Sequence, residues 1–191
     1  LLATSYLLFD WLQDNAMFGA DQVIIGSASS KTGLGLCRYL AEPKGRTYKI
    51  VGLTSEGNRE FVQSLGTCDS VLTYDQISDI ARVPSVYVDM SGNSDVKARL
   101  HDHLDDQLKH SAAVGLSHWD RFAPAQKLAG PKPEFFFAPA QVAKRRADWG
   151  PGVIEKQIIA AWKRIASDAA EWLTLQVQDG VAASEPVYQA L

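Results

Sequence analysis

We expect the chain to fold as an α/β domain: a doubly wound parallel sheet with helices on both faces, in strand order 3-2-1-4-5-6. Apolar runs typical of buried strands recur along the sequence with helical or polar segments between them, which is the βαβα alternation of such a sheet. The first run breaks abruptly into a turn of small residues that opens a helix. With 191 residues, the chain is also long enough to bury the core of one domain without disulfides or metal ions.

The expected elements follow this alternation in order. An amphipathic helix opens the chain within residues 1–20. Further helices connect the strands and are expected at residues 32–41, 58–65, 76–81 and 95–107. Six strands are typical of a Rossmann-type sheet, and we expect them at residues 22–27, 48–53, 70–74, 85–90, 110–116 and 134–138.

A long helix is expected at residues 153–177, after the run from Trp149 to Gly152. Apolar residues recur there at helical spacing, so they share one face of the helix and should pack against an apolar surface. These residues are Ile154, Ile158, Ala161, Ile165, Ala169, Trp172 and Leu173.

Charge and cysteine usage exclude several classes of protein. The chain has 19 basic and 22 acidic side chains, a net charge of −3, and its basic residues are scattered, so neither nucleic acid nor a membrane surface is expected as a partner. No run reaches the roughly 20 apolar residues of a membrane-spanning helix. Cys37 and Cys68 form neither a disulfide framework nor a CxxC pair, which indicates a reducing cytoplasm. His101 and His103 point in different directions on a helix, so no metal site is expected.

The turn after the first strand is the most informative segment, and residues 22–35 read QVIIGSASSKTGLG. Its small side chains let backbone N–H groups approach an anion at the N-terminus of the helix that follows. The turn is therefore a candidate phosphate site, with an ordinary tight turn without ligand as the alternative. The residues expected to bind there are Ala28, Ser29, Ser30, Lys31, Thr32 and Gly33.

Three nucleotide-binding motifs compete for this turn. A Walker A loop requires GxxxxGK[ST], and Lys31 and Thr32 match its end, but Ile25 and Ser30 stand at its two glycine positions. Asp89 would suit the magnesium ligand of such an ATPase, yet Ile25 cannot start the tight turn. A short-chain dehydrogenase is excluded because no tyrosine has a lysine four residues later. A dinucleotide-binding domain remains, although GxGxxG is absent.

The end of the second strand indicates which dinucleotide would bind. A site selective for NAD places a carboxylate there to accept a hydrogen bond from the ribose 2′-hydroxyl. Here Thr54, Ser55, Asn58 and Arg59 supply hydroxyls, an amide and a guanidinium, which suit a 2′-phosphate, while Glu56 is an opposing charge. We therefore expect NADP(H) as cofactor, and the alternative for Arg59 is a solvated position on a helix.

Five segments carry a resemblance to a known family, and they read SASSKTGLGL, VGLTSEGN, FVQSLGTCDSVLTYD, PEFFFAPAQVAKR and ADWGP. With them the chain resembles an uncharacterised family, described only as a domain of unknown function, that is related to the medium-chain dehydrogenase/reductases of the quinone-oxidoreductase type. The resemblance spans most of the chain. It implies the nucleotide-binding part of such an enzyme, without the catalytic barrel that supplies zinc ligands in some members of the superfamily.

The resemblance also implies a division of the chain. Residues 1–20 would be a lead-in helix from a missing N-terminal domain, residues 21–150 the dinucleotide-binding Rossmann domain, and residues 151–191 a C-terminal helical segment that packs on it.

Two further strand ends would line the nicotinamide half of the cleft in such a fold. Ser91 and Gly92 follow the fourth expected strand, and Gly115 lies near the end of the fifth. His118 comes directly after the fifth strand and is the candidate catalytic residue, with a structural or exposed position as the alternative.

The sequence thus predicts the cofactor-binding portion of a zinc-independent oxidoreductase that uses NADP(H) and transfers a hydride to a carbonyl or an activated alkene of an unidentified small molecule. The alternative is a non-catalytic Rossmann-like module that no longer binds nucleotide and serves in interaction or dimerisation. Phe135, Phe136 and Phe137 on the last expected strand would suit pairing of two copies, so a homodimer is expected under either reading, unless that strand is buried in its own fold.

Overall fold

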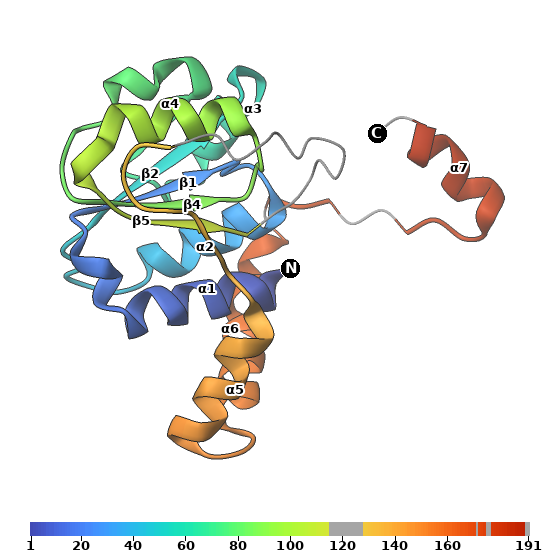
Figure 1. Ribbon diagram of the computed structural model, residues 1–191. Coiled ribbons are helices and arrows are strands. Elements are labelled where there is room, and N and C mark those ends of the chain that lie inside the picture. The colour runs from blue at the N-terminus through green and yellow to red at the C-terminus, as the bar shows by residue number, and fades with distance from the viewer. Residues whose placement is uncertain (115–127, 171, 175–176, 190–191) are drawn as a thin grey trace.

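A six-stranded parallel sheet in the order β3-β2-β1-β4-β5-β6 forms the centre of the molecule (Figure 1). The computed structural model describes residues 1–114, 128–170, 172–174 and 177–189. The expected fold class and strand order are confirmed. The strands are β1 (Gln22–Gly26), β2 (Lys49–Thr54), β3 (Ser70–Thr73), β4 (Ser85–Asp89), β5 (Leu108–Ala113) and β6 (Glu134–Phe135).

β1 and β4 lie at the middle of the sheet, and every residue of both strands is buried. Burial on both faces explains why their sequences are continuous apolar runs rather than alternating ones. In the register, Ile24 lies between Val51 of β2 and Tyr87 of β4, and Gly26 lies beside Asp89. The loops that follow β1 and β4 therefore start from adjacent points at one edge of the sheet.

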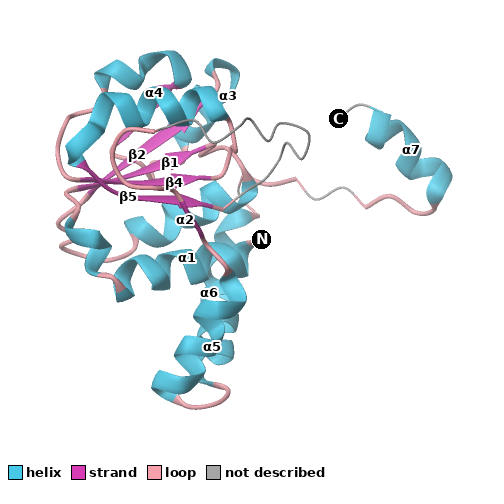
Figure 2. Ribbon diagram, in the orientation of Figure 1, coloured by secondary structure: helices cyan, strands magenta, loops and turns pink. Residues whose placement is uncertain are grey.

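Helices cover both faces of the sheet (Figure 2). Val23 and Ile25 of β1 belong to a core cluster that contains residues of α1, α2, α3 and α6, whereas Ile24 belongs to a second cluster with residues of α4 and η2. The alternation of side chains along the strand distributes them between the two clusters. The bounds of these helices are α1 (Leu2–Asp14), α2 (Lys31–Ala41), α3 (Glu56–Ser64), η2 (Tyr74–Asp79), α4 (Ser94–Leu104) and α6 (Val153–Ala169).

α1 packs directly on α2. A Cβ on Gly35 would lie 2.6 Å from Oγ of Ser5, so the helices approach closely at this glycine. The Ser5 hydroxyl also donates a hydrogen bond to the carbonyl oxygen of Thr32, with an O···O distance of 2.9 Å. Among the described helices, none is long and apolar enough to cross a bilayer.

A 3₁₀ turn, η1 (Ala16–Gly19), connects α1 to β1 and has an unusual backbone. Ala16, Met17 and Phe18 have φ values of 48°, 52° and 54°, in the left-handed region that residues with a Cβ rarely adopt. The turn places Phe18 flat against the ring of His110, with 4.0 Å between the ring centroids and an interplanar angle of 9°. Aromatic stacking thus accompanies this strained connection. A further short turn, η3 (Asp105–Gln107), joins α4 to β5.

The sequence prediction was wrong around residues 134–149. The strand expected at 134–138 contains only Glu134 and Phe135, and helix α5 (Ala138–Trp149), which no pattern had predicted, begins directly after Phe137. The signal was present, because Pro139 occupies the first turn of α5, a position that suits the fixed φ of proline.

The C-terminal helix is also shorter than expected. α6 ends at Ala169 rather than at residue 177, and a separate helix, α7 (Val181–Gln189), follows. Trp172 still packs against the core, but the backbone reaches it through a turn in which the N–H groups of Trp172 and Leu173 both bond to the carbonyl oxygen of Ala169. The apolar pattern therefore identified residues that pack against the core, although the last of them lie beyond the end of the helix. Figure 1 shows α7 away from the sheet, and none of its residues is buried.

Candidate functional site

The carboxyl ends of β1 and β4 form the candidate site. β1 continues into α2 on one face of the sheet, and β4 continues into α4 on the other, so the chain diverges between these neighbouring strands. In open α/β sheets, ligands bind in the crevice at such a point. The predicted phosphate turn, the end of β2 and the loop after β4 all lie along this edge.

The turn between β1 and α2 has a fixed shape, which we call the phosphate turn (residues 26–33). Ser27 has a φ of 56°, and Ser30 caps α2 because its side-chain oxygen accepts a hydrogen bond from the N–H of Gly33 at 3.1 Å. A Cβ on Gly33 would lie 2.6 Å from the carbonyl oxygen of Ser27, so the turn closes on a residue without a side chain. Ser30 thus satisfies the N–H of Gly33, and the amides of Lys31 and Thr32, at the first two positions of α2, have no acceptor within the helix and face the place where an anion would bind.

Two hydrogen bonds connect the phosphate turn to β2. The N–H of Ala28 donates to the carbonyl oxygen of Leu53 at 2.9 Å. The hydroxyl of Thr54 donates to the hydroxyl of Ser29 at 3.0 Å. The structure thus brings together the two groups of residues that the sequence analysis assigned to the phosphates and to the ribose. Lys31 is exposed at the start of α2, and no acidic side chain among the described residues forms an ion pair with it.

Arg59 and Asn58 lie in the first turns of α3, which begins after Ser55. The side-chain amide of Asn58 donates to the hydroxyl of Ser55 at 3.1 Å. Nε of Arg59 is buried and has no hydrogen-bond partner within the described part of the chain. A buried guanidinium N–H without a partner is costly unless an anion accepts from it. This donor and the N-terminus of α2 are groups that suit a phosphate.

Asp89, at the end of β4, holds the loop that follows. Its buried carboxylate accepts hydrogen bonds through Oδ1 from the N–H of Ser91 at 3.0 Å, the hydroxyl of Ser91 at 2.8 Å and the N–H of Gly92 at 3.0 Å. Oδ2 pairs with Nζ of Lys97 at 3.1 Å. Sequence reasoning named Asp89 only as a magnesium ligand and missed this role. A lone aspartate directly after a buried apolar strand is the signal that could have found it.

Two tyrosines near this edge remain protonated. Tyr87 of β4 is buried beneath the phosphate turn, and a Cβ on Gly26 would lie 2.6 Å from its hydroxyl. Burial raises the pKa of Tyr87 well above its ordinary value. Burial also raises the pKa of Tyr74, where contacts with Ser27 act in the opposite direction. Neither phenol therefore ionises near neutral pH, and the charges at this edge come from the lysine, arginine and aspartate side chains described above.

Gly115 and His118 lie outside the described residues, so the structure says nothing about either prediction. His101, which the sequence analysis had discussed only for metal binding, is a core residue. Its Nδ1 contacts the carbonyl oxygen of Ala129 at 2.8 Å and its Nε2 contacts the hydroxyl of Ser111 at 2.9 Å. Burial lowers the pKa of His101. Within the part of the chain that the structure describes, no three His, Cys, Asp or Glu side chains are close enough to hold a metal ion.

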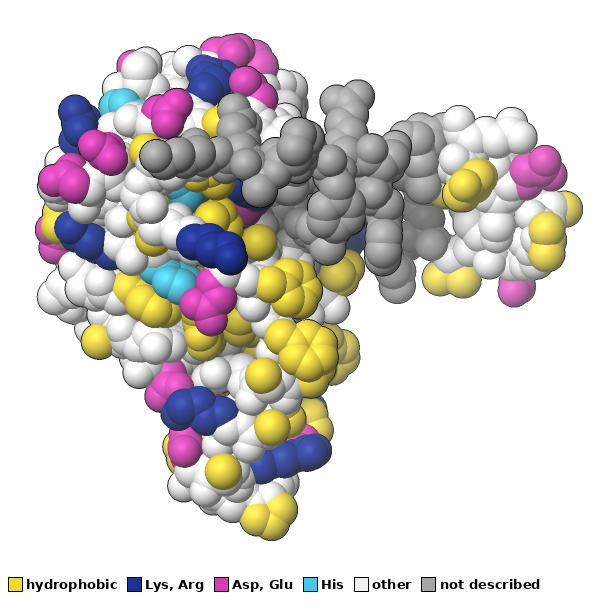
Figure 3. All heavy atoms as spheres, viewed as in Figure 1, with side chains coloured by type: hydrophobic (Ala, Val, Ile, Leu, Met, Phe, Trp, Pro, Cys, Tyr) yellow, Lys and Arg dark blue, Asp and Glu magenta, His cyan; other side chains and the backbone are white. Residues whose placement is uncertain are grey.

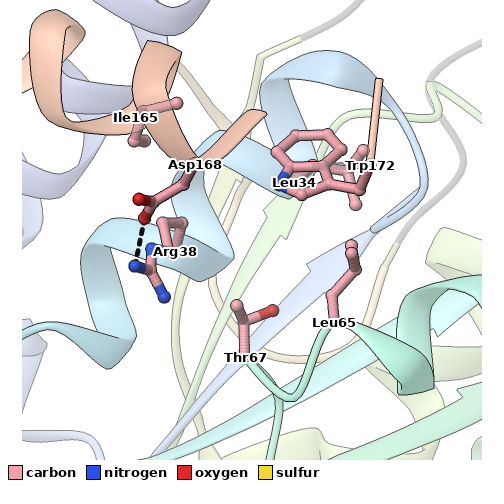
Figure 4. A pocket seen from close by; sticks show the side chains of 7 residues that line it. All are labelled: Leu34, Arg38, Leu65, Thr67, Ile165, Asp168 and Trp172. Carbon is pink, nitrogen blue, oxygen red and sulfur yellow. Dashed lines mark hydrogen bonds and ion pairs between the residues drawn. The ribbon is translucent and has the colours of Figure 1, made fainter. Parts of the chain in front are cut away.

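A separate hollow of about 190 Å³ runs along α2 (Figure 4). None of the predicted cofactor-binding residues lines it. Leu34 and Arg38 of α2 face the end of α6 across this hollow, and Arg38 pairs with Asp168 there. The remaining lining residues are Leu65, Thr67, Ile165 and Trp172.

The fold and this edge together define the class of the protein: a Rossmann-type domain with a turn of small residues before its first crossover helix. Over residues 1–191 the chain matches the family described as "Protein of unknown function (DUF2855)", and it belongs to that family. No curated protein matches it in sequence.

Solved structures share the fold. The yhdH oxidoreductase from Salmonella enterica in complex with NADP has a TM-score of 0.60 at 16% identity, covering 99% of this chain and 56% of that chain. A putative NADPH:quinone reductase from Mesorhizobium loti has a TM-score of 0.62 at 12% identity, covering 92% and 50%. An Etr1p mutant in complex with NADP and crotonyl-CoA has a TM-score of 0.58 at 14% identity, covering 100% and 56%. The chain therefore spans about half the length of these proteins.

Proposed function

We propose that this chain is the NADP(H)-binding portion of a zinc-independent oxidoreductase that reduces a carbonyl or an activated alkene. The observation that carries the proposal is the buried Nε of Arg59, which has no hydrogen-bond partner among the described residues and belongs to α3, the helix that follows β2 at the same edge of the sheet as the phosphate turn. The structural neighbours support it, because several are described as oxidoreductases or as complexes with NADP. The bound cofactor would supply the hydride, and the protein would supply orientation and electrostatics.

Each part of the edge has a role in this proposal. Lys31 and the amides at the start of α2 would hold the pyrophosphate. Arg59 would pair with the 2′-phosphate of the adenosine ribose, together with the other polar side chains that follow β2. The loop that Asp89 holds through Ser91 would line the nicotinamide half of the cleft. The polar residues expected around the 2′-phosphate are Thr54, Ser55, Asn58 and Arg59.

The test is a calorimetric titration of the purified chain with NADPH and with NADH. Loss of one charged hydrogen bond to phosphate costs about 1.5–3 kcal/mol, so Arg59→Ala should weaken NADPH binding about tenfold or more and leave NADH binding unchanged. Lys31→Ala should weaken both cofactors, because both carry the pyrophosphate. Equal affinity of the wild-type chain for the two cofactors would contradict the assignment of Arg59.

Matched controls come from exposed residues of the same charge. Arg82→Ala and Lys44→Ala remove exposed cations that lie outside the proposed site, so both variants should bind NADPH like the wild type. If the two control variants lost as much affinity for NADPH, the effect would come from the net charge of the protein and not from contacts at the proposed site.

A second candidate function is an interaction module that keeps the fold without a nucleotide. Lys31 favours it, because its bulk stands in a turn where small residues admit a phosphate most easily. Phe135, in the last strand, and Phe137, shortly after it, also favour it, because they are 56% and 58% exposed. If a folded sample bound neither NADPH nor NADH, the result would favour the interaction module over the cofactor-binding domain.

A further inference from the structure

The carboxylate of Asp89 uses its two oxygens for two different parts of the chain. Oδ1 accepts three hydrogen bonds from the loop that follows β4. Oδ2 is buried, and among the described residues it has one partner, the ammonium group of Lys97, whose Nζ lies 3.1 Å away. The side chain of Asp89 is 1% exposed and that of Lys97 is 20% exposed, so water cannot readily replace this partner. Lys97 therefore supplies the counter-charge of the carboxylate that holds the loop.

Lys97 belongs to α4, which covers the face of the sheet opposite to α1 and α2 (Figure 1). It lies one turn into this helix, and its backbone N–H donates to the carbonyl oxygen of Asn93 at 3.0 Å. Because side chains of a helix point towards its N-terminus, Nζ of Lys97 reaches back to the end of β4. The ion pair thus connects the first turns of α4 to the strand that precedes it.

The loop between β4 and α4 is held from both ends. The hydroxyl of Ser91, which donates to Asp89, accepts a hydrogen bond from the N–H of Asn93 at 3.1 Å. The side-chain oxygen of Asn93 caps α4, because it accepts from two N–H groups of the first turn at 3.0 and 3.1 Å. Gly92 has a φ of 65°, in the left-handed region that glycine adopts easily. The conformation of the loop therefore depends on the position of the Asp89 carboxylate.

The same loop begins beside the phosphate turn. Gly26 lies next to Asp89 in the register, and the N–H of Met90 donates to the carbonyl oxygen of Gly26 at 3.3 Å. A ligand that binds through phosphate at the start of α2 and extends along this edge of the sheet therefore reaches the loop after β4. In the proposed function, this part of the ligand is the nicotinamide half of NADP(H).

We propose that Lys97 is a positioning residue for the nicotinamide half of the cofactor. It acts through Asp89 and not by contact with the ligand. The ammonium group fixes Oδ2, and the carboxylate then holds Ser91 and Gly92 through Oδ1, so that these two residues line the nicotinamide half of the cleft. The inference rests on the proposed function, because it assigns Lys97 to one half of that site. The adenosine half is assigned to α2 and α3, so Lys97 should not affect it.

Two ligands separate the halves of the site. NADPH occupies both halves, whereas 2′-phospho-ADP-ribose carries the adenosine and the phosphates without the nicotinamide ring. In calorimetric titrations, Lys97→Met should weaken NADPH binding about tenfold, as for the loss of one hydrogen bond to the ligand, and leave the binding of 2′-phospho-ADP-ribose unchanged. Lys97→Arg keeps a cation there and should restore most of the NADPH affinity. Unchanged NADPH binding in Lys97→Met, or equal weakening of both ligands, would overturn the proposal.

A second substitution tests whether Lys97 acts through Asp89. Asp89→Asn keeps an oxygen that can accept from the loop but removes the charge that pairs with Lys97. It should weaken NADPH binding, and the double variant Asp89→Asn with Lys97→Met should bind NADPH no more weakly than Asp89→Asn alone. Additive losses would show that Lys97 acts on the ligand by another route, against the assigned role.

Arg99→Met is the matched control on the same helix. Arg99 forms an ion pair with Asp95 at 3.7 Å, and both side chains are exposed, at 42% and 75%. This variant should bind NADPH and 2′-phospho-ADP-ribose like the wild type. A loss of NADPH affinity as large as that of Lys97→Met would trace the effect to the charge of α4 and contradict a role for the pair with Asp89.

Hydrogen exchange in the ligand-free chain reports on the loop without any cofactor. The N–H groups of Ser91 and Gly92 donate to Asp89, so they should exchange slowly in the wild type and about tenfold faster in Lys97→Met. Circular dichroism checks folding, and Lys97→Gln takes the place of Lys97→Met if the latter does not fold. Unchanged exchange would overturn the role of Lys97. A wild-type chain that binds neither ligand would contradict the proposed function instead, and the exchange rates would still decide whether Lys97 holds the loop.

Discussion

Gly33 shows at the scale of one residue why the phosphate turn needs its composition. An added Cβ would meet the carbonyl oxygen of Ser27, and it would also lie 3.1 Å from the Cα of Ala28. Both are backbone atoms, so neither can move aside without changing the turn itself. Gly57, at the start of α3, offers the opposite case, because a Cβ there meets nothing within 4 Å.

Gly33→Ala should therefore destabilise the chain by about 1–3 kcal/mol, the usual cost of forcing extra volume into a packed site. It should also weaken NADPH binding. Gly57→Ala should leave the free energy of unfolding unchanged or raise it by up to about 1 kcal/mol, as expected for glycine in a helix. Urea unfolding of both variants is the measurement. A Gly33→Ala chain as stable as the Gly57→Ala chain would contradict the close approach.

The candidate site could be predicted only where its residues are close in sequence. The phosphate turn and the start of α3 are local patterns, so small residues, hydroxyls and Arg59 marked them. The position of Tyr87 beneath Gly26 depends on the register between β1 and β4, which no local pattern contains. The pairing of Asp89 with Lys97 depends on how α4 packs after β4.

At the scale of elements, buried charges join α5 to α1. Arg145 donates through Nε to Asp10 at 2.7 Å and through Nη1 to Asp14 at 2.9 Å, and its guanidinium lies 4.4 Å from the ring centroid of Trp149. Gln141 also donates to Asp10, at 2.6 Å. Asp10 and Arg145 are buried, so each charge needs the other.

Arg145→Met should destabilise the chain by about 3–5 kcal/mol, because it leaves the buried carboxylate of Asp10 without its counter-charge. Arg146→Met is the matched control, since Arg146 is exposed and its ion pair with Glu155 lies at the surface. It should change the free energy of unfolding by less than about 1 kcal/mol. Chemical denaturation of both variants measures the free energy of unfolding. Equal decreases in the two variants would contradict the stabilising role of the buried pair of Asp10 and Arg145.

The elements differ in how far the sequence predicts them. β1 and β4 follow from their continuous apolar runs, because strands in the middle of a parallel sheet are buried on both faces. α5 was missed because its apolar stripe is weak and the phenylalanines before it resemble a strand. Its buried residues are Gln141 and Arg145, and polar contacts leave no apolar periodicity in a sequence.

At the scale of the whole molecule, the edge of the sheet at β6 is a candidate interaction surface. β6 ends the strand order, and Figure 3 shows hydrophobic side chains gathered where α5 begins beside it. Phe135 and Phe137 are more than half exposed there, and a hollow of about 210 Å³ lies next to them. An exposed edge with apolar side chains is a template for pairing with another strand. We propose a second copy of this chain as that partner, related by a two-fold axis.

The double substitution Phe135→Glu and Phe137→Glu should convert the dimer to a monomer, because it places like charges at the shared edge. Light scattering coupled to size-exclusion chromatography measures the mass. Ile159→Glu changes an exposed residue of α6 and should leave the dimer intact. A wild-type chain that is monomeric at high micromolar concentration would contradict the proposed pairing.

The connection between α1 and β1 has a consequence for the position of the whole sheet. From Ala16 to Phe18 the backbone follows the mirror image of an ordinary helical turn, which costs about 1–2 kcal/mol for each L-residue. Contacts at the end of the turn offset this cost. Here the turn stacks Phe18 on His110 and leads directly into β1. The left-handed turn thus fixes where β1 begins. Because the phosphate turn directly follows β1, its position depends on the same three residues.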